Sequence, residues 1–308
     1  MNISVIIPVF NAERFINKAV ESAISHIEVK EVLLIEDGSN DNSFQICKAL
    51  AAKNNRIFLY HHKNRKNKGA GASRNLGLLK ATQKYVCFLD ADDFMAENRF
   101  EKEKKIFSEY RDCDGVYGAI GVCYIDKTGA KAWEKKGNTI KSLTTVNKQI
   151  KPEHLFEFLI SFNNPNEYKG YFSIDALTLK RESLLKNKIF FDESLRLHQD
   201  TVFIFQCAYY LNLYTGEYQI PIAFRGIHKN NRFIFHTNLK DSRSKQFKSL
   251  IKWSKNEGLK KEYKNFFIKQ YRNINPKSSI IKKSYNKIKL GLTYIRNLII
   301  TNNSVKIW

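Results

Sequence analysis

The chain has 308 residues, 43% of them hydrophobic, enough to bury the core of one large or two modest globular domains. Its formal net charge of +22 is unevenly placed, because residues 236–308 hold 18 Lys and Arg against 3 Asp and Glu, a net charge of +15. The apolar runs are too short for a bilayer-spanning helix, so we expect any membrane contact to be peripheral.

The first half of the chain alternates predicted strands and helices. Apolar runs predict strands over 3–10, 31–35, 56–60 and 85–89, and helical apolar spacing predicts helices over 12–25, 41–53 and 73–82. This βαβα order predicts an α/β fold with a mostly parallel central sheet and helices on both faces. Ligands of such sheets lie beyond the carboxyl ends of the strands, where Asn11, Asp37 and Asp90 fall.

The second half is less regular. Strands are predicted within 116–125 and 172–179, and helices over 152–162, 181–187 and 200–211. From about residue 236 the chain becomes Lys-rich and is predicted to be helical. We expect a nucleotide-sugar-binding half over residues 1–120, an acceptor-binding half of the same catalytic domain over 121–235, and a basic helical region over 236–308.

The basic region contains one amphipathic pattern. Its apolar residues recur at steps of three and four and predict one helix face: Ile281, Tyr285, Ile288, Leu292, Ile295 and Ile299. A basic amphipathic helix suits an anionic membrane surface, which would also suit a lipid-linked acceptor. The same helix could instead pack on the catalytic domain.

The cysteines and the N-terminal residues indicate the cellular compartment of the protein. The five cysteines form no CxxC pair and show no metal-ligand spacing, which indicates reduced, structural thiols. No signal peptide precedes the strand that begins at Ile3. We therefore expect a cytoplasmic protein, peripheral at the inner face of the cell membrane.

Three carboxylates follow the buried strand predicted at 85–89: Asp90, Asp92 and Asp93. Carboxylates at such a place are costly to desolvate unless they find a cation. On an extended backbone Asp90 and Asp92 would lie on the same side, where an oxygen-liganded divalent ion could bind and still accept phosphate oxygens. A turn or a helix cap is the alternative, and we expect Asp93 to cap or to support its neighbours.

Other polar residues fall near the strand ends. Asp37 could bind a base N–H group, although the turn after it also suits a helix cap. Residues 66–75 combine glycines, cations and a helix start, which favours phosphate, with Arg74 on the helix side. Asp200 suits a helix N-terminus. His228, beside Arg225 in a polar turn, could contact phosphate or metal.

Together these motifs resemble the family 2 inverting glycosyltransferases of the GT-A fold, over roughly residues 1–235. The resemblance rests on segments 4–11, 36–41, 67–77, 88–93, 191–203 and 225–228, in that order. It implies a GT-A, Rossmann-like α/β fold with a basic helical C-terminal extension. It also implies transfer of a sugar from a nucleotide-diphosphate sugar, commonly a UDP-sugar, to a glycan or lipid-linked acceptor in surface polysaccharide synthesis.

The resemblance also implies roles for individual residues. Pro8, Phe10, Asn11 and Asp37 would line the nucleoside pocket, with Asp37 on the base, and Arg74 would help to hold the donor. Asp90 and Asp92 would form the Asp-x-Asp element that binds Mn²⁺ or Mg²⁺, and His228 is a further candidate ligand. Asp200 matches the catalytic base. The Glu that usually precedes this base is replaced by Gln199, which affects the expected acceptor contact.

Two other functions are compatible with part of the sequence. A sugar nucleotidyltransferase would need a Gly-rich phosphate loop directly after the first strand, where this chain has residues 11–14, Asn-Ala-Glu-Arg. A non-enzymatic nucleic-acid-binding protein would fit the charge, but the basic residues form no recognition motif, and acidic strand ends repel phosphate without metal. We therefore expect no nucleic-acid partner.

Overall fold

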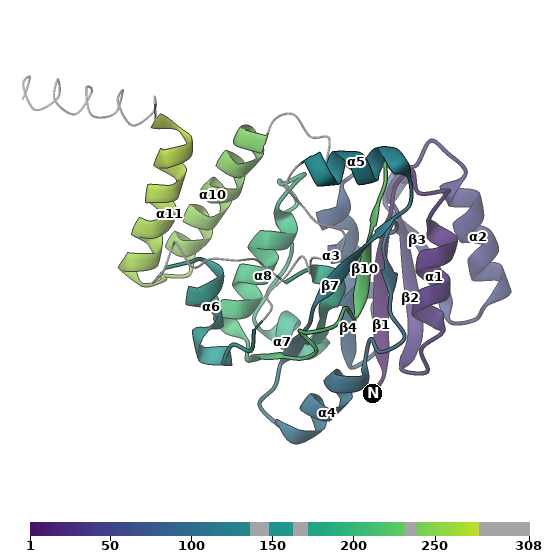
Figure 1. Ribbon diagram of the computed structural model, residues 1–308, viewed down its shortest axis with the longest axis horizontal. Coiled ribbons are helices and arrows are strands. Elements are labelled where there is room, and N and C mark those ends of the chain that lie inside the picture. Colours follow the sequence, from purple (N-terminus) through teal and green to yellow (C-terminus); the bar gives the residue numbers. More distant parts are fainter. Residues whose placement is uncertain (136–147, 163–171, 232–238, 277–308) are drawn as a thin grey trace, which may run out of the picture. The chain divides into compact units, whose positions relative to one another are not determined.

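The computed structural model describes residues 1–135, 148–162, 172–231 and 239–276 (Figure 1). Its internal contacts divide the chain into two compact units, Met1–Asn238 and Leu239–Trp308. The sequence-based boundaries at residues 120 and 235 stay predictions. The amphipathic helix predicted over 281–299 lies outside the described residues.

A seven-stranded mixed sheet runs through the first unit in the order β3-β2-β1-β4-β8-β6-β9. Its strands are β1 (Ile3–Val9), β2 (Val29–Glu36), β3 (Ile57–His61), β4 (Tyr85–Phe88), β6 (Gly115–Tyr117), β8 (Leu177–Lys180) and β9 (Leu213–Thr215). β1 is parallel to β2 and β4, and β2 is parallel to β3, whereas β8 is antiparallel to β4 and β6. The carboxyl ends of the four parallel strands therefore lie at the same end of the sheet.

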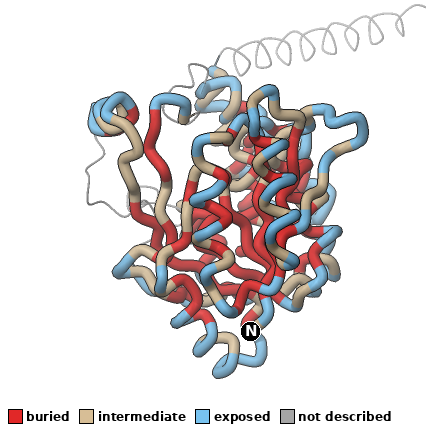
Figure 2. The backbone as a smooth tube through the Cα atoms, turned by 90° about the vertical axis from the view of Figure 1, so that its right-hand side faces the viewer, coloured by how far each residue is buried: buried red, intermediate tan, exposed pale blue. Residues whose placement is uncertain are grey.

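Helices cover both faces of these parallel strands. α1 (Ile16–Ile24) and α2 (Ser43–Lys53) lie on one side, and α3 (Ala70–Lys80) and α8 (Gln199–Tyr210) lie on the other (Figure 1). Val5 and Ile7 of β1 share a core cluster with α1, whereas Ile6 faces α3, where Gly77 leaves room for it. Burial on both faces explains the near-continuous apolar runs, and Figure 2 shows the strands as the buried centre of this unit.

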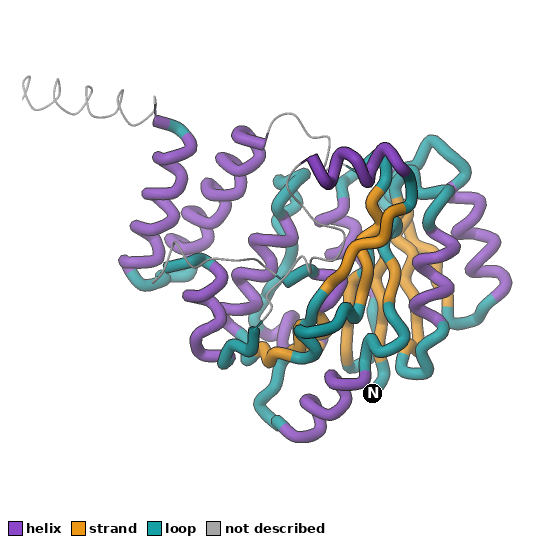
Figure 3. Tube along the Cα trace, viewed as in Figure 1, coloured by secondary structure: helices purple, strands orange, loops and turns teal. Residues whose placement is uncertain are grey.

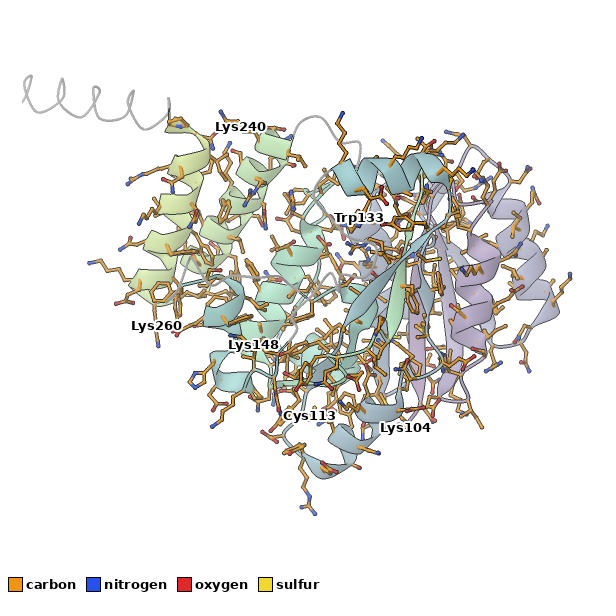
Figure 4. The ribbon with its side chains drawn as sticks, in the orientation of Figure 1. Lys104, Cys113, Trp133, Lys148, Lys240 and Lys260 are labelled. Carbon is orange, nitrogen blue, oxygen red and sulfur yellow. The ribbon has the colours of Figure 1, made fainter. Side chains whose placement is uncertain are left out.

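A second sheet joins β5 (Phe94–Met95), β10 (Ala223–Ile227) and β7 (Ile120–Tyr124). α5 (Lys127–Lys135) packs on this sheet through Trp133, which clusters with Ile227, Val122 and Tyr124 (Figure 4). Because β5 follows residues 90–93 and pairs with β10, this sheet brings the turn after β10 to the end of β4.

The predicted fold class is confirmed: an α/β unit with a mostly parallel central sheet and flanking helices, followed by C-terminal helices (Figure 3). Within the described residues of the first unit, further α-helices are α4 (Glu101–Glu109), α6 (Pro152–Leu159) and α7 (Arg181–Lys186). The strand expected over 172–179 begins as a 3₁₀ turn, η2 (Ile174–Ala176), before β8.

The described part of the second unit is a helical hairpin. α10 (Leu239–Asn256) and α11 (Lys261–Ile274) pack through an apolar seam that includes Trp253 and Phe267, whose ring centroids lie 6.5 Å apart. The exposed side of α10 carries a row of lysines at helical spacing: Lys245, Lys248, Lys252 and Lys255.

Candidate functional site

The loops after β1 and β2 bind each other at the carboxyl edge of the sheet. The backbone N–H of Asn11 donates to Ser39 Oγ (3.1 Å), and the Asn40 N–H donates to Asn11 Oδ1 (2.9 Å). Asn11 has a left-handed backbone with φ of 50°, a conformation that Asn tolerates better than most residues. Phe10 is 43% exposed and Pro8 is half-buried, so β1 presents an open polar and aromatic surface at its end.

Asp37 is buried beneath the loop that precedes α3. Its Oδ1 accepts the N–H of Lys68 (2.6 Å) and its Oδ2 accepts the N–H of Gly69 (2.8 Å). His62 Nε2 lies 3.7 Å from Oδ1. Because each carboxylate oxygen has two acceptor sites, these bonds leave capacity for a further donor. Asp37 therefore fixes the loop that precedes α3 to the end of β2. The turn after Asp37 also caps the next helix, because Asp41 Oδ1 accepts the N–H of Ser43 (3.0 Å) at the start of α2.

Arg74 on α3 is 3% exposed and forms an ion pair with Asp90. Burial acts to lower the pKa of Arg74, but the charges of Asp90, Asp200 and Asp175 raise it above its ordinary value. Among the described residues, the buried Nε and Nη1 atoms of Arg74 have no hydrogen-bond partner. A buried guanidinium with unused N–H groups is suited to binding an anion.

The backbone of residues 90–93 is a turn rather than the extended segment that the sequence suggested. The Asp93 N–H donates to the Asp90 carbonyl oxygen (3.0 Å), and the turn sends the two predicted metal ligands in different directions. Asp90 binds Arg74, whereas Asp92 binds residues that follow β10. The expected arrangement on one side of a strand was wrong, because this local hydrogen bond is satisfied only in a turn.

Asp92 receives two donors from the turn after β10. His228 Nε2 lies 2.9 Å and Asn231 Nδ2 lies 3.2 Å from Asp92 Oδ2. His228 Nδ1 accepts the N–H of Asn230 (3.2 Å), which places the imidazole proton on Nε2. The His228 ring packs on Phe15, with centroids 4.4 Å apart. The predicted residues Asp92 and His228 are thus brought into contact.

Asp93 is buried and holds the end of β10 against the turn at residues 90–93. Its Oδ1 accepts the Gly226 N–H (2.9 Å), and a Cβ on Gly226 would overlap the Asp92 carbonyl oxygen. Burial, followed by the charges of Asp175 and Asp92, raises the pKa of Asp93 well above its usual range. The expectation that Asp93 supports its neighbours agrees with these contacts.

Asp175, at the 3₁₀ turn before β8, is a site residue that the sequence analysis missed. Its Oδ1 accepts the Asp90 N–H (2.9 Å) and its Oδ2 accepts Ser173 Oγ (2.7 Å). Burial, and then the charge of Asp90, raises the pKa of Asp175 to about 6. The available signal was a single carboxylate inside the apolar run 172–179.

These carboxylates fit a divalent cation. One oxygen each from Asp90, Asp93 and Asp175 lies within 4.8 Å of the others. Hard oxygen ligands of this kind are those that Mg²⁺ and Mn²⁺ accept. Burial and then the neighbouring carboxylates raise the pKa values of Asp93 and Asp175, and a bound cation would favour their charged forms.

Asp200 lies in the first turn of α8, whose entry is tied to α3. Asn75 exchanges hydrogen bonds with the backbone of Phe191, and its Nδ2 also donates to Glu193 (2.9 Å). The charge of Asp200 raises the pKa of both Arg74 and Arg225, which places Asp200 in the same electrostatic environment as Asp90 and Asp93. The packing of α8 on α3 thus brings the predicted base to the strand ends.

Sequence comparisons identify relatives. The family model of glycosyl transferase family 2 matches residues 4–166. An uncharacterized glycosyltransferase of Haemophilus influenzae is 31% identical over 206 residues, 67% of this chain and 71% of that protein. The minor teichoic acid biosynthesis protein GgaA of Bacillus subtilis is 30% identical over 213 residues, 66% of this chain but only 42% of GgaA.

Structural comparison gives the same fold. S. aureus TarS 1-349, crystallised in complex with UDP-GlcNAc, aligns with a TM-score of 0.63 and 17% identity over 89% of this chain and 72% of that one. The chain belongs to glycosyltransferase family 2 and is a glycosyltransferase. This result favours the first of the three functions considered above. No helix within the described residues is long and apolar enough to cross a membrane.

Proposed function

We propose that this chain is a metal-dependent, inverting glycosyltransferase that moves a sugar from a UDP-sugar to a hydroxyl of a glycan or lipid-linked acceptor. The observation that carries the proposal is the convergence of Asp90, Asp175 and Asp200 on the buried, partly unpaired Arg74 at the carboxyl ends of the parallel strands. The bound UDP and UDP-GlcNAc of the structural neighbour TarS support the choice of donor.

The divalent ion, Mn²⁺ or Mg²⁺, would be held by Asp92 and His228, which contact each other, and by Asp90, which lies in the carboxylate cluster with Asp93 and Asp175. When bound, it would neutralise the charge that develops on the leaving nucleotide diphosphate. The Nε and Nη1 groups of Arg74 are free to donate to the same diphosphate, because neither has a partner among the described residues. His228 would have to give up its Nε2 proton, and its bond to Asp92, in order to bind the ion.

The nucleoside would bind over the loops after β1 and β2, against Pro8, Phe10, Asn11 and Asp37. The half-buried Pro8 and the exposed ring of Phe10 offer a surface for the base and ribose. Asp37 retains acceptor capacity beyond its two backbone bonds, as recognition of a base N–H group requires.

Asp200 would be the catalytic base. It takes the proton of the acceptor hydroxyl, whose oxygen then attacks the anomeric carbon from the face opposite the leaving diphosphate. One such displacement inverts the anomeric centre. Asp200 lies in the first turn of α8, where the positive end of the helix dipole favours a negatively charged group.

The acceptor would be a surface glycan, as the name of the relative GgaA suggests for that protein. The exposed lysines of α10, together with the net charge of +15 over residues 236–308, support peripheral contact with the anionic inner face of the cell membrane. We expect that removal of residues 277–308 releases the protein from anionic liposomes, and equal binding by the shortened chain would refute a role for that segment.

The proposal is tested by a donor-hydrolysis screen of the full chain across UDP-, GDP- and dTDP-sugars, with Mn²⁺, with Mg²⁺ and with EDTA. We expect turnover of a UDP-sugar that requires added metal. Turnover of equal rate in EDTA would contradict metal dependence, and turnover of only GDP- or dTDP-sugars would contradict the proposed donor.

A further inference from the structure

The Asn231 side chain binds both Asp92 and the backbone of His228, two of the residues proposed to bind the metal ion. Its Oδ1 accepts the backbone N–H of His228 (2.5 Å). Its Nδ2 donates both to Asp92 Oδ2 (3.2 Å) and to the Gly226 carbonyl oxygen (3.0 Å). One amide group thus contacts the Asp-x-Asp turn, the end of β10 and the His228 turn.

The orientation of this amide is fixed by its partners. A backbone N–H can only donate, so the oxygen of Asn231 must face His228 and the NH₂ group must face Asp92. Both NH₂ partners, a carboxylate and a carbonyl oxygen, can only accept. All three bonds are therefore compatible with one orientation and incompatible with the flipped one.

The turn at residues 228–231 does not depend on Asn231 alone. The Asn231 N–H donates to the His228 carbonyl oxygen (3.1 Å), and the Lys229 N–H donates to Asp126 Oδ2 (2.9 Å). Asp126 Oδ1 in turn accepts the Gly129 N–H (2.7 Å) of α5. The Asn231 side chain adds to this support its bonds to the His228 N–H and the Gly226 carbonyl oxygen, and a bond to Asp92 that no backbone contact replaces.

The two donors to Asp92 bind the same carboxylate oxygen. His228 and Asn231 both bind Oδ2, while Oδ1 accepts no hydrogen bond from any residue that the structure describes. The Asp92 side chain is 33% exposed, so an ion can reach this carboxylate from solvent. If His228 turns from Asp92 to the ion, Asn231 is the donor that continues to hold Oδ2.

We propose that Asn231 is a positioning residue that orients Asp92 and the His228 turn for binding of the divalent ion. This inference rests on the proposed metal-dependent function. Side chains that orient metal ligands typically change metal affinity by about 10- to 100-fold when they are replaced.

The test is Mn²⁺ binding by the full chain, measured by electron paramagnetic resonance titration with and without UDP, and it does not depend on turnover. We expect Asn231→Ala to weaken Mn²⁺ binding by about 10-fold or more. The matched control is Asn230→Ala, because the exposed Asn230 contributes its backbone N–H, and no side-chain contact, to His228. This control should bind Mn²⁺ as the parent chain does.

Thermal denaturation in EDTA separates positioning from folding. If Asn231→Ala fails to fold, Asn231→Ser takes its place, since its hydroxyl oxygen can still accept from the His228 N–H but is too short to reach Asp92. Unchanged Mn²⁺ affinity in the folded variant would overturn the inference and leave the proposed function standing. Absence of Mn²⁺ binding by the parent chain, even with UDP, would overturn both.

Discussion

Arg74, buried on α3, forms an ion pair with Asp90, the first carboxylate after β4. The pair joins the guanidinium of α3 to the carboxylate that follows β4. It leaves two buried N–H positions of the guanidinium without partners among the described residues. The relationship explains why an acidic cluster and a basic loop can share one site: each neutralises part of the other, and the remaining donors are available to a phosphate.

We predict that Arg74→Met weakens binding of the nucleotide-sugar donor by about 10- to 100-fold, since a hydrogen bond to a charged group contributes about 1.5–3 kcal/mol. Isothermal titration calorimetry with Mn²⁺ measures the change. Arg111→Met is the matched control, because Arg111 is exposed before β6 and away from the strand ends. Donor affinity of Arg74→Met equal to that of the control would show that Arg74 serves only to balance Asp90.

Asp200→Asn is predicted to reduce sugar transfer by about 1,000-fold, because general-base catalysis typically contributes between 100- and 10,000-fold. Donor affinity should change by no more than about twofold, since in our account Asp200 acts on the acceptor. Transfer is measured with the best donor from the hydrolysis screen, and affinity by calorimetry. A large loss of donor affinity with unchanged turnover would assign Asp200 to the donor side instead.

Asp175 is predicted to make the metal-free protein more stable in mild acid than at neutral pH. Its pKa is raised to about 6, mainly by burial and the charge of Asp90, so folding favours its protonated form. This contribution of Asp175 to the free energy of unfolding is fully present below the ordinary pKa of a carboxyl group, about 4, and is lost as the pH rises through about 6. In Asp175→Asn the contribution is absent.

The measurement is the melting temperature in EDTA between pH 5 and pH 7.5, for the parent chain and for Asp175→Asn. We expect the parent chain to lose stability with rising pH relative to the variant. An identical pH profile for the two proteins would show that Asp175 titrates normally. The groups that face Asp175 are Asp90, Asp93, Arg74, Arg225 and Ser173, and all five remain in the variant.

Gly226→Ala is predicted to destabilise the protein by about 1–3 kcal/mol, the usual cost of added volume in a packed site. The new Cβ would overlap the carbonyl oxygen of Asp92, so the turn at 90–93 or the end of β10 must shift. Chemical denaturation measures the stability. A variant as stable as the parent chain would mean that these two segments are less tightly packed than the structure indicates.

The strands that build the site could be predicted from sequence because they are buried on both faces. β1, β2 and β4 appear as near-continuous apolar runs, and polar residues follow each of them. Three strand ends at the same end of the sheet were enough to bring Asn11, Asp37 and Asp90 together. The helix that carries Arg74 was predicted over 73–82 and begins three residues earlier, at Ala70.

Other parts of the site could not be predicted because they depend on long-range pairing. β5 is only two residues long, too short to show a period of its own, yet its pairing with β10 brings Asn231 to Asp92. Asp175 lies in a run that looks like an ordinary strand, and only its bond to the Asp90 N–H reveals its place. The turn at 90–93 was mistaken for extended backbone, since an Asp-rich segment fits both.

Binding of UDP by isothermal titration calorimetry, with Mn²⁺ and then with EDTA, shows whether a divalent ion joins the diphosphate to the end of β4. We expect UDP to bind the parent chain with Mn²⁺, and binding to be lost both in EDTA and in Asp92→Ala with Mn²⁺ present. UDP affinity that is the same under all three conditions would contradict a metal-bridged diphosphate site at the end of β4.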